Sequence, residues 1–403
     1  MTDVTDLVER LRSGDLQLHQ LDDHTDPDAA ATARREYVAE ETGADLDTVG
    51  AYSIDAADAD PNIENMIGTI QVPLGVAGPL PVTGDAAGED YRIPLATTEG
   101  ALVASVNRGI TAIREAGGAS ASIVKSGITR APVFTVEDVR EAKAVADWVR
   151  DNEGVIAEVA EETDPHIAFE DVTPYVVGDS VFLRFRYDTG DAMGMNMVTI
   201  ASRAASELVE EETPAELVAL SGNLCSDKKP AAINAVEGRG YTVAADVFLP
   251  DDLVEERFHA TSADLATVNT RKNLVGSAKA GSLGFNAHVA NIVGAAFLAL
   301  GQDEAQVVEG SNAITSLEAR EDGLYASVTL ASLELGTVGG GTALPTQSEA
   351  LSILGVAGGG DPVGSNAEEL AEVIAATALA GELSLLGALA SRHLSSAHEE
   401  LGR

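Results

Sequence analysis

The best candidate for a membrane span in this chain is the segment from Leu274 to Gly301, LVGSAKAGSLGFNAHVANIVGAAFLALG. Whether this segment could cross a membrane decides whether we expect a membrane protein. Lys279, Asn286, His288 and Asn291 interrupt it. A membrane-spanning helix needs an apolar run of about 18 residues or more, and none remains here. We therefore expect a long buried helix of a soluble protein and no membrane partner.

One face of this predicted helix carries small and polar residues. Ser277, Gly281, Gly284, His288 and Asn291 recur at spacings of four and three, which places them on one stripe. Glycine lets the backbone of a partner approach closely, and buried polar side chains need hydrogen-bond partners. Helix packing with a satisfied histidine and asparagine accounts for the stripe without assigning it a function.

The composition describes a globular protein with more than one domain. The chain has 403 residues, of which 45% are hydrophobic but only 4% are aromatic. That length suffices for two or three domains with separate cores. Because aromatic residues are scarce, we expect the cores to consist of Ala, Val, Leu and Ile.

Acidic residues outnumber basic ones by 65 to 25, which gives a formal net charge of −40. The acids are spread along foldable segments, so they do not form an acidic tail. A surface this negative repels nucleic acids and anionic membranes, and we expect neither as a partner. Such a protein is suited to concentrated salt, which screens self-repulsion over short distances.

A single cysteine and the N-terminal sequence indicate a cytoplasmic protein. Cys225 has no second cysteine with which to form an internal disulfide, which favours a reducing compartment. The N-terminal sequence MTDVTDLVERL lacks a basic region followed by an apolar run, so it does not predict a signal peptide.

Hydrophobic periodicity and turn residues divide the chain into successive segments. Residues 1–60 predict a helical lead-in, with a helix over 26–43 that starts at Asp-Pro and stops at Gly43. From Glu64 on, short apolar runs cut by Pro and Gly predict strands and turns. The pattern further predicts helices over 97–118, 136–151, 196–212 and 367–394, strands over 180–188 and 241–250, and a turn or linker over 55–61.

Two adjacent lysines lie in SGNLCSDKKPAAIN, residues 221–234, although the whole chain holds only six lysines. A lysine that is buried there needs a carboxylate partner, for which Asp227 is one candidate, or its pKa shifts. Such a lysine, Lys228 or Lys229, could stabilise an oxyanion or bind an anionic substrate. Solvated charges on a loop are the alternative interpretation.

Three further polar side chains lie beside turn residues in apolar surroundings. Glu99 follows two threonines in TTEGA, Asp303 lies in GQDEAQ, and His398 lies near the end of the chain. Each has a simple structural explanation. An acid in the first turn of a helix favours the helix dipole, and the other two fit a solvated loop and a chain terminus. None of the three indicates a function by itself.

Known cofactor motifs are absent, although two glycine-rich turns could admit a phosphate or a ribose. These are GDAMGMNMV at 190–198 and GTVGGGTALPTQ at 336–347. Neither is a G-x-G-x-x-G after a strand, and the chain has no Walker loop and no G-x-S-x-G elbow. The histidines lack metal-ligand spacing and one cysteine cannot make a zinc site, so we expect no catalytic metal.

The motifs, in their order and spacing, resemble the 3-hydroxy-3-methylglutaryl-CoA (HMG-CoA) reductase family in its class I branch. The resemblance runs from Glu64 to the end of the chain. It is carried by ENMIG, VPLGVAGPL, TTEGALVASVNRG, GDAMGMNMV, SGNLCSDKKPAAIN, KNLVGSAKAGSLGFNAHVANIV, GQDEAQ, GTVGGGTALPTQ and the late histidine. Each motif alone is weakly specific, but their joint occurrence is not accidental.

The resemblance implies a reaction and a fold. The reaction is the four-electron reduction of (S)-HMG-CoA to (R)-mevalonate and CoA with two NADPH per turnover, the first committed step of isoprenoid synthesis by the mevalonate pathway. The fold is α+β: a helical N-terminal segment (1–63), a large α/β substrate domain (64–131 and 220–403) around a long central helix, and an inserted small ferredoxin-like NADP(H) domain (132–219). Family members share the active site between two subunits, which implies a homodimer and a dimer of dimers.

The resemblance also assigns roles to individual residues. Lys228 would stabilise the developing alkoxide, Glu99 would donate a proton, Asp303 would link the two, and His398 would protonate the CoA thiolate. The substrate would be held by Glu64, Arg130, Ser221, Asn223, Lys229, Lys272 and Asn291, and its CoA pyrophosphate by Ser105, Asn107 and Arg108. The nicotinamide nucleotide would lie against Asp191, Met193, Gly194, Met195 and Asn196.

Two other functions fit part of the same pattern. One is an NAD-linked reductase that runs in reverse and oxidises mevalonate, because the Ser-Arg pair that helps hold the NADPH 2′-phosphate in animal enzymes has no counterpart near Asp164–Phe169. The other is an acyl-CoA-binding protein without turnover. The joint presence of Glu99, Lys228, Asp303 and His398 argues against a simple binder, which needs no acid for a thiolate.

Overall fold

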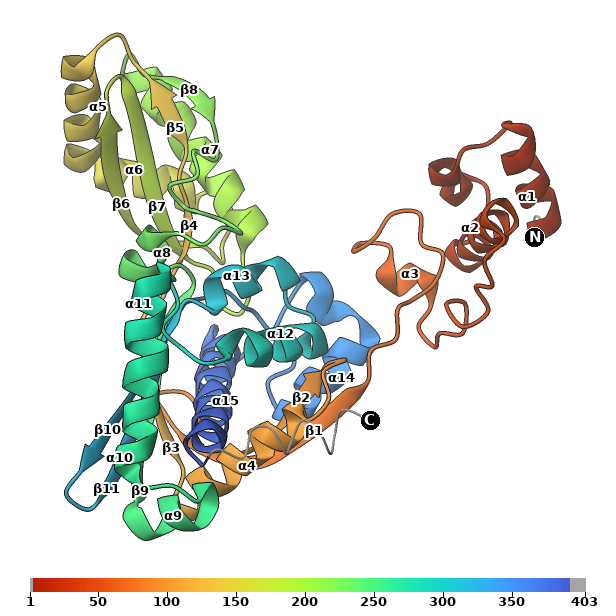
Figure 1. Ribbon diagram of the computed structural model, residues 1–403. Helices are drawn as coiled ribbons and strands as arrows, with labels where there is room; N and C mark the ends of the chain where they lie inside the picture. The colour runs from red at the N-terminus through yellow and green to blue at the C-terminus, as the bar shows by residue number, and fades with distance from the viewer. Residues whose placement is uncertain (1–2, 392–403) are drawn as a thin grey trace.

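The computed structural model describes residues 3–391, which form three regions (Figure 1). The first region is a group of N-terminal helices: α1 (Val4–Ser13), the 3-10 helix η1 (Leu18–Asp23), α2 (Pro27–Thr42) and the short α3 (Ala56–Ala59). Three of these elements share a small apolar core that includes Leu7, Leu11 and Leu21. The predicted helical lead-in is confirmed.

Helix α2 has the ends that the sequence predicts. The Asp26 carboxylate accepts a hydrogen bond from the backbone N–H of Ala29 at 3.0 Å, and Gly43 ends the helix in the left-handed conformation at φ 70°. The turn predicted over 55–61 is partly wrong. Residues 56–59 form α3, because Ala56 and Ala59 are buried in an apolar cluster that also holds Ala31 of α2.

The second region is built on a six-stranded sheet with the order β10-β11-β9-β3-β1-β2. Its strands are β1 (Leu74–Thr83), β2 (Asp90–Ala96), β3 (Ala119–Lys125), β9 (Tyr241–Pro250), β10 (Ala313–Arg320) and β11 (Gly323–Leu333). Neighbouring strands are antiparallel, except β1 and β3, which run parallel. Buried residues alternate with more exposed ones along β11, as expected for a sheet with one face on a core.

Helices cover this sheet, and the longest, α15 (Ser365–Ala390), lies in the core of the region (Figure 1). Around it lie α4 (Leu102–Glu115), α9 (Asp251–Phe258), α10 (Ser262–Val268), α12 (Val289–Leu300) and α14 (Pro345–Leu354). The backbones of α4 and α15 touch at Gly109, where a Cβ atom would lie 1.8 Å from the carbonyl oxygen of Ala380. Only glycine permits this approach.

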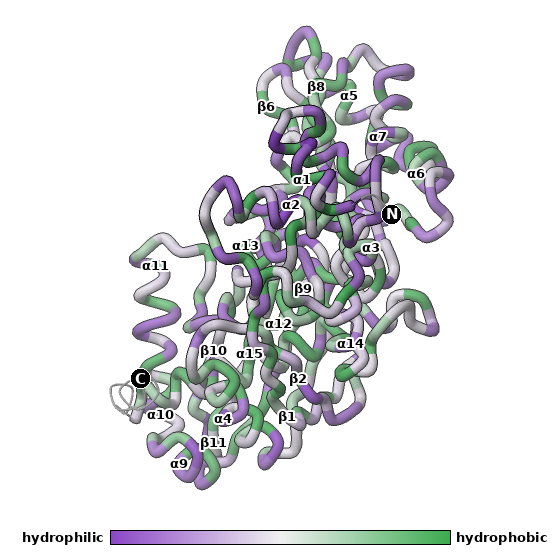
Figure 2. The backbone as a smooth tube through the Cα atoms, turned by 90° about the vertical axis from the view of Figure 1, so that its right-hand side faces the viewer, coloured by the Kyte–Doolittle hydropathy of each residue, from purple (hydrophilic) through white to green (hydrophobic). Residues whose placement is uncertain are grey.

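Helix α15, not the segment over 274–301, is the strongest candidate for a membrane span by length and hydropathy. It is the one helix within residues 3–391 that is long and apolar enough, and 78% of its most apolar 18-residue window is buried inside the protein. This burial accounts for its apolar sequence. Figure 2 shows the hydrophobic colour along α12 and α15, whereas α1 and α2 are largely hydrophilic.

The single long helix predicted over 274–301 is wrong. The chain there forms the π-helical segment η2 (Asn269–Gly276), the one-turn helix α11 (Ser277–Ala280), an irregular stretch over 281–288, and then α12. Gly281 ends α11 by adopting the left-handed conformation at φ 72°. The predicted stripe of small and polar residues therefore does not lie on one helix, and the central helix of the region is α15.

Polar side chains of the predicted stripe fix the irregular stretch instead. The amide of Asn286 donates to the backbone carbonyls of Ser311 and Ala313, and its side-chain oxygen accepts from the N–H of Val289 at the start of α12. The imidazole Nε2 of His288 lies 2.8 Å from the carbonyl oxygen of Gly381. These side chains thus bond backbone groups of the neighbouring segments and fix the irregular stretch against them, which periodicity alone does not predict.

The third region is a five-stranded antiparallel sheet packed against three helices. Its strands are β4 (Ile128–Arg130), β5 (Val133–Thr135), β6 (Ala168–Val177), β7 (Ser180–Asp188) and β8 (Glu216–Ala219), and its helices are α5 (Val139–Asp151), α6 (Glu153–Glu161) and α7 (Met195–Glu212). The predicted helices over 136–151 and 196–212 and the strand over 180–188 are confirmed. The domain boundaries at 132 and 219 stay a prediction.

Candidate active site

The two adjacent lysines lie in an irregular segment, Ser221–Pro230, which we call the lysine loop. It connects β8 of the third region to α8 (Ala232–Glu237) of the second. Asn223, Ser226 and Lys228 have φ values of 61°, 50° and 57° in this loop. A left-handed backbone at residues other than glycine costs free energy and persists where surrounding contacts fix it.

Lys228 forms an ion pair with Asp303, and the distance from its Nζ to the carboxylate Oδ2 is 2.7 Å. Asp303 lies just past the end of α12 and caps the 3-10 helix η3 (Glu304–Gln306) by accepting from the N–H of Ala305. The hydrogen bond that the Lys228 ammonium donates to Asp303 raises the pKa of Lys228 above its usual value. The ammonium is therefore a persistent cation, and 44% of its side chain is exposed.

Asp227, the sequence neighbour that we considered as a partner for the lysine, pairs with arginines instead. Its Oδ1 lies 3.3 Å from Nη2 of Arg239, and its Oδ2 lies 3.9 Å from Nη1 of Arg130. The fully buried Arg239 also contacts the buried Glu334. The Lys228 cation at the surface of the loop is therefore adjacent in sequence to Asp227, which belongs to a buried cluster of ionisable side chains.

Burial, together with the nearby Glu309 and Asp227, raises the pKa of Glu334 to about 8, although the Arg239 cation opposes the shift. Between pH 4.5, the ordinary pKa of a glutamate, and about pH 8, the Glu334 carboxyl group is protonated in the folded protein and ionised in the unfolded chain. The free energy of unfolding must therefore fall as the pH rises through this window, by at most about 1.4 kcal/mol per pH unit for one group.

The variant Glu334→Gln tests this pH dependence, because it removes the titrating carboxyl group. We expect denaturant unfolding at pH 6, 7 and 8 in constant molar KCl to show a smaller loss of stability with pH for the variant than for the wild type. Identical slopes for the two proteins would show that Glu334 is already ionised at neutral pH.

A cavity of about 680 Å³ adjoins the ion pair. One side is formed by Lys228 and Asp303, and another by the glycine-rich turn with Gly339, Gly340 and Gly341. Four of the residues predicted to bind the nicotinamide nucleotide also line it: Met193 and Gly194 before α7, and Met195 and Asn196 at the start of α7. We call residues 191–196 the cofactor loop. The structure therefore brings the lysine, its carboxylate partner and both glycine-rich turns to one cavity.

Asp191, the fifth predicted cofactor residue, does not line this cavity. Its buried carboxylate accepts four backbone N–H groups at 2.8 to 3.1 Å, from Gly360, Gly364, Asn366 and Ala367 at the start of α15. The side chain thus ties the cofactor loop to the core helix of the second region. Negative charge is also favourable at the N-terminus of a helix.

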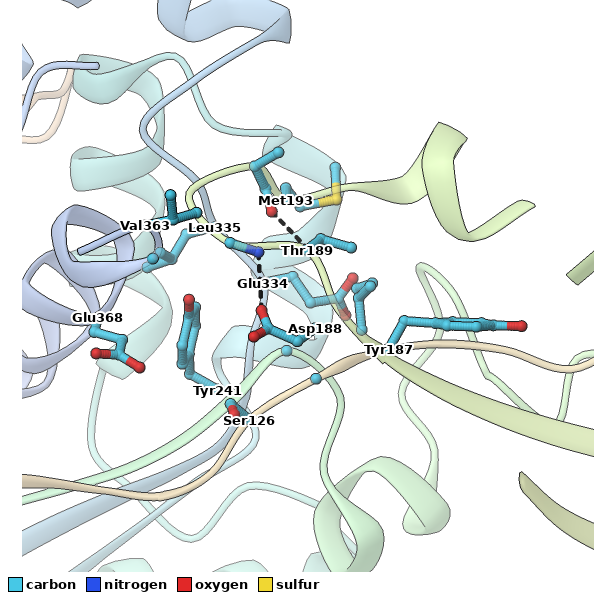
Figure 3. Close-up of a pocket in the computed structure, with 16 residues that line it drawn as sticks. Ser126, Tyr187, Asp188, Thr189, Met193, Tyr241, Glu334, Leu335, Val363 and Glu368 are labelled. Atoms are coloured by element: carbon cyan, nitrogen blue, oxygen red, sulfur yellow. Dashed lines mark hydrogen bonds between the residues drawn. The ribbon is translucent and has the colours of Figure 1, made fainter. Parts of the chain in front are cut away.

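Figure 3 shows a smaller cavity of about 50 Å³ on the other side of the same loop. Tyr241 and Glu368 of the second region line it together with Asp188 of the third. The Asp188 carboxylate accepts from the N–H of Gly190, and the Thr189 hydroxyl donates to the carbonyl of Ala192, both at 2.8 Å. These bonds fix the chain direction just before the cofactor residues.

Glu99 lies apart from this ion pair. It follows β2 in the turn before α4, it is exposed, and its Oε1 accepts a hydrogen bond from the amide of Asn291 at 3.4 Å. Within residues 3–391 no hydrogen bond or ion pair joins Glu99 to Lys228 or Asp303. Of the predicted link from Glu99 through Asp303 to Lys228, the described residues show the contact between Asp303 and Lys228 and no bond between Glu99 and Asp303. His398 lies outside the described residues.

The sequence matches the model of the hydroxymethylglutaryl-coenzyme A reductase family over residues 30–403. The chain belongs to this family. Similar reductases include those of Haloferax volcanii, 67% identical, and Halobacterium salinarum, 66% identical, which are aligned over all of this chain and over 100% and 99% of their own lengths. A reductase of Dictyostelium discoideum is 45% identical over 84% of this chain and 62% of its own length.

The reductase fold is also found in solved structures. A class II HMG-CoA reductase from Streptococcus pneumoniae, bound to NADPH in open conformations, has a TM-score of 0.68 and 18% identity and covers 93% of this chain. A second structure of the Streptococcus pneumoniae enzyme has a TM-score of 0.66. The expected α+β class is confirmed, whereas membership of the class I branch stays a prediction.

The reductase residues predicted to hold the acyl group belong to several segments, of which the lysine loop is one. The Lys229 backbone N–H donates to the buried Glu309 at 3.1 Å, and Ser221 Oγ lies 3.6 Å from the buried Cys225 Sγ. Lys272, in η2, donates to the side chain of Asn273 at 3.1 Å. Asn223 and Glu64 are exposed.

The residues predicted to lie near the CoA pyrophosphate belong to one helix of the reductase, α4. Ser105 shares a hydrogen bond of 3.0 Å with Ser384 of α15. The side-chain oxygen of Asn107 accepts from the N–H of Gly78 at 2.9 Å, and Arg108 is exposed. Of the three, Arg108 is the one charged residue, and its exposed position suits contact with a phosphate.

Sequence reasoning missed the buried part of the reductase site: Arg239, Gln306, Glu309 and Glu334. One signal was available, because Glu334 lies within the largely apolar run TLASLELGT, residues 329–337, which begins in β11 and extends beyond its end. A charged residue in such a run needs a buried partner. Among residues 3–391 no group of three or more His, Cys, Asp or Glu side chains is placed to hold a metal ion.

Proposed function

We propose that this reductase converts (S)-HMG-CoA to (R)-mevalonate and CoA with two NADPH, and so begins isoprenoid synthesis by the mevalonate pathway. The observation that carries the proposal is the Lys228–Asp303 ion pair, 2.7 Å between Nζ and Oδ2, on the wall of a cavity that the cofactor loop also lines. Reducing a thioester requires a cation at the carbonyl oxygen and a hydride donor on the same side of a pocket.

The residues around the cavity fit a nicotinamide dinucleotide. Gly194 has φ 77°, and an added Cβ atom would lie 2.4 Å from the Thr189 side chain, so this tight turn before α7 requires glycine. Gly339 and Gly340 leave their backbone open, because nothing lies within 4 Å of an added Cβ. Met193, Met195 and Asn196 would hold the nicotinamide end. NADPH supplies the hydride when it is bound.

Lys228 acts on the oxygen of the reacting carbonyl. As hydride reaches the carbon, the oxygen gains negative charge, which a fixed ammonium stabilises more in the transition state than in the ground state. Asp303 keeps the ammonium protonated and aims it. The same placement serves both reductions, because thioester and aldehyde each develop charge at oxygen.

Glu99 and His398 would supply the protons. Glu99 would donate to the alkoxide, and Asn291, which bonds its carboxylate, would orient it. His398 would protonate the departing CoA thiolate. Lys229 would bind the free carboxylate of the substrate, and Arg130, Ser221, Asn223 and Lys272 would help to hold the acyl group. Ser105, Asn107 and Arg108 would lie near the CoA pyrophosphate.

A second copy of the chain would complete the site. The segment after the N-terminal helices exposes Ile63, Ile70, Leu74 and Val76 by 46 to 83% in the single chain. Apolar residues exposed in one continuous segment are typical of a subunit interface. We infer a homodimer in which Glu64 reaches the partner site, and two dimers that form a tetramer. The lone buried Cys225 supports a cytoplasmic location.

The test is NADPH oxidation by the purified chain with HMG-CoA in molar KCl. We expect two NADPH consumed for each mevalonate formed, and a lower rate with NADH. Binding of HMG-CoA without NADPH oxidation would favour the acyl-CoA-binding protein. Faster oxidation of mevalonate with CoA and NAD than reduction of HMG-CoA would favour the reverse reaction.

A further inference from the structure

The lysine loop contains a strained backbone that needs support from outside. Three residues other than glycine have positive φ values within it. Asn234 supports the loop by donating its amide to the carbonyl of Ser226 at 3.0 Å, and Glu309 supports it by accepting from the N–H of Lys229 at 3.1 Å. A third support, Arg239, acts on Asp227, the residue directly before Lys228.

Arg239 differs from the other supports because it contacts four separate segments. Its Nη2 lies 3.3 Å from Asp227 Oδ1 and 3.0 Å from the Met195 sulfur, and its Nη1 donates to Gln306 at 3.3 Å and to Glu334. These residues belong to the lysine loop, the cofactor loop, the turn that begins with Asp303, and the chain after β11.

The burial of this cluster makes it a rigid junction. Arg239 and Gln306 are 0% exposed and Glu334 is 1% exposed. A buried guanidinium adds little net stability, because desolvation offsets the attraction to its partners, but its planar shape fixes the direction of each hydrogen bond. Gln306 contacts both Arg239 and the Arg239 partner Asp227, because the Gln306 amide donates to Asp227 Oδ1 at 3.0 Å.

We propose that Arg239 is a positioning residue, which holds the Lys228 cation and the Met195 end of the cofactor loop at one fixed separation. The oxyanion stabiliser and the hydride donor must meet the same carbonyl, and they come from different regions of the fold. An error of about 1 Å in such an arrangement costs about a hundredfold in rate. This inference rests on the proposed function.

The variant Arg239→Lys tests the proposal, because it keeps the charge and loses the planar fork. We expect kcat to fall about a hundredfold, with KM for HMG-CoA within about threefold of wild type. With NADPH deuterated at the transferred position, the isotope effect on kcat should increase, because a misplaced donor makes hydride transfer rate-limiting.

A second readout needs neither cofactor nor substrate. In hydrogen–deuterium exchange of the free protein, Arg239→Lys should speed exchange in peptides covering 221–230 and 191–197 about tenfold or more, and leave α15 unchanged. If the proposed function is wrong, the wild-type protein will not oxidise NADPH, but Arg239→Lys will still speed exchange in these two segments. The two failures are therefore distinguishable.

Arg34→Lys is the matched control. Arg34 is 2% exposed, donates to the carbonyl of Leu18 at 2.9 Å and pairs with Asp22 within the N-terminal helices. This variant loses a buried guanidinium of the same kind, and it should leave the isotope effect and the exchange over 221–230 at wild-type values.

Two results would overturn the proposal. One is a folded Arg239→Lys variant with kcat within about threefold of wild type. The other is a lower kcat with an unchanged isotope effect and unchanged loop exchange, which indicates a merely structural role. If Arg239→Lys does not fold, the variant Gln306→Leu tests the proposal in its place. A fall in kcat of about tenfold with faster exchange over 221–230 would support the proposal. Wild-type kcat and wild-type exchange would overturn it.

Discussion

Replacing Lys228 by alanine is expected to lower the turnover of HMG-CoA with NADPH at least about a hundredfold, because one preorganised stabiliser of a developing oxyanion contributes that much or more. The Lys228 ammonium lies 2.7 Å from Asp303, which keeps it charged. Its loss leaves the carbonyl oxygen without a counter-charge in the transition state. Steady-state NADPH oxidation in molar KCl measures the effect.

A surface lysine provides the control for this substitution. Lys143 on α5 has a side chain that is 76% exposed and pairs with Asp147 one turn away. Lys143→Ala changes the net charge by the same amount and should retain wild-type turnover. The melting temperatures of both variants separate folding from chemistry. A Lys228→Ala enzyme with wild-type kcat would remove this lysine from the reaction.

Lowering the salt is expected to unfold the protein or abolish its activity. The formal net charge is −40 on 403 residues, so like charges repel one another over the whole surface. The Debye length is about 3 Å at 1 M salt and about 30 Å at 0.01 M, so dilution restores repulsion among most surface carboxylates. The related reductases from halophilic archaea, 66 and 67% identical, are consistent with this expectation. Circular dichroism and NADPH oxidation across a KCl series measure it.

A non-ionic solute separates screening from general stabilisation of the fold. Sucrose favours compact states without screening charge. If screening is the cause, sucrose at matched osmolality should not replace KCl, whereas NaCl should. Full activity in dilute buffer, or full rescue by sucrose, would contradict the role given to the acidic surface.

The sequence predicts elements well where local signals and tertiary packing agree. Helix α2 begins after Asp26 and ends at Gly43 as its capping residues indicate, and strand β7 covers Ser180–Asp188. The prediction failed over 274–301, where Gly281 ends a helix and Asn286 bonds the backbone carbonyl of Ser311. Hydrophobic periodicity does not reveal such breaks, because the hydrogen-bond partners that stabilise them come from segments distant in the sequence.

The candidate site could be predicted in its exposed part and not in its buried part. The scarcity of lysine singled out Lys228, and the resemblance paired it with Asp303, which the geometry bears out as an ion pair. The sequence could not show that Arg239 lies against Glu334, because the two residues are 95 positions apart along the chain. Their contact depends on how the chain after β11 packs against the segment before β9.

The most direct measurement is a crystal structure of the protein with HMG-CoA bound. It should place the Nζ atom of Lys228 at hydrogen-bond distance, about 3 Å, from the thioester carbonyl oxygen, with Asp303 still paired to the same ammonium. An ammonium that points into bulk solvent, more than about 6 Å from that oxygen, would contradict the mechanism.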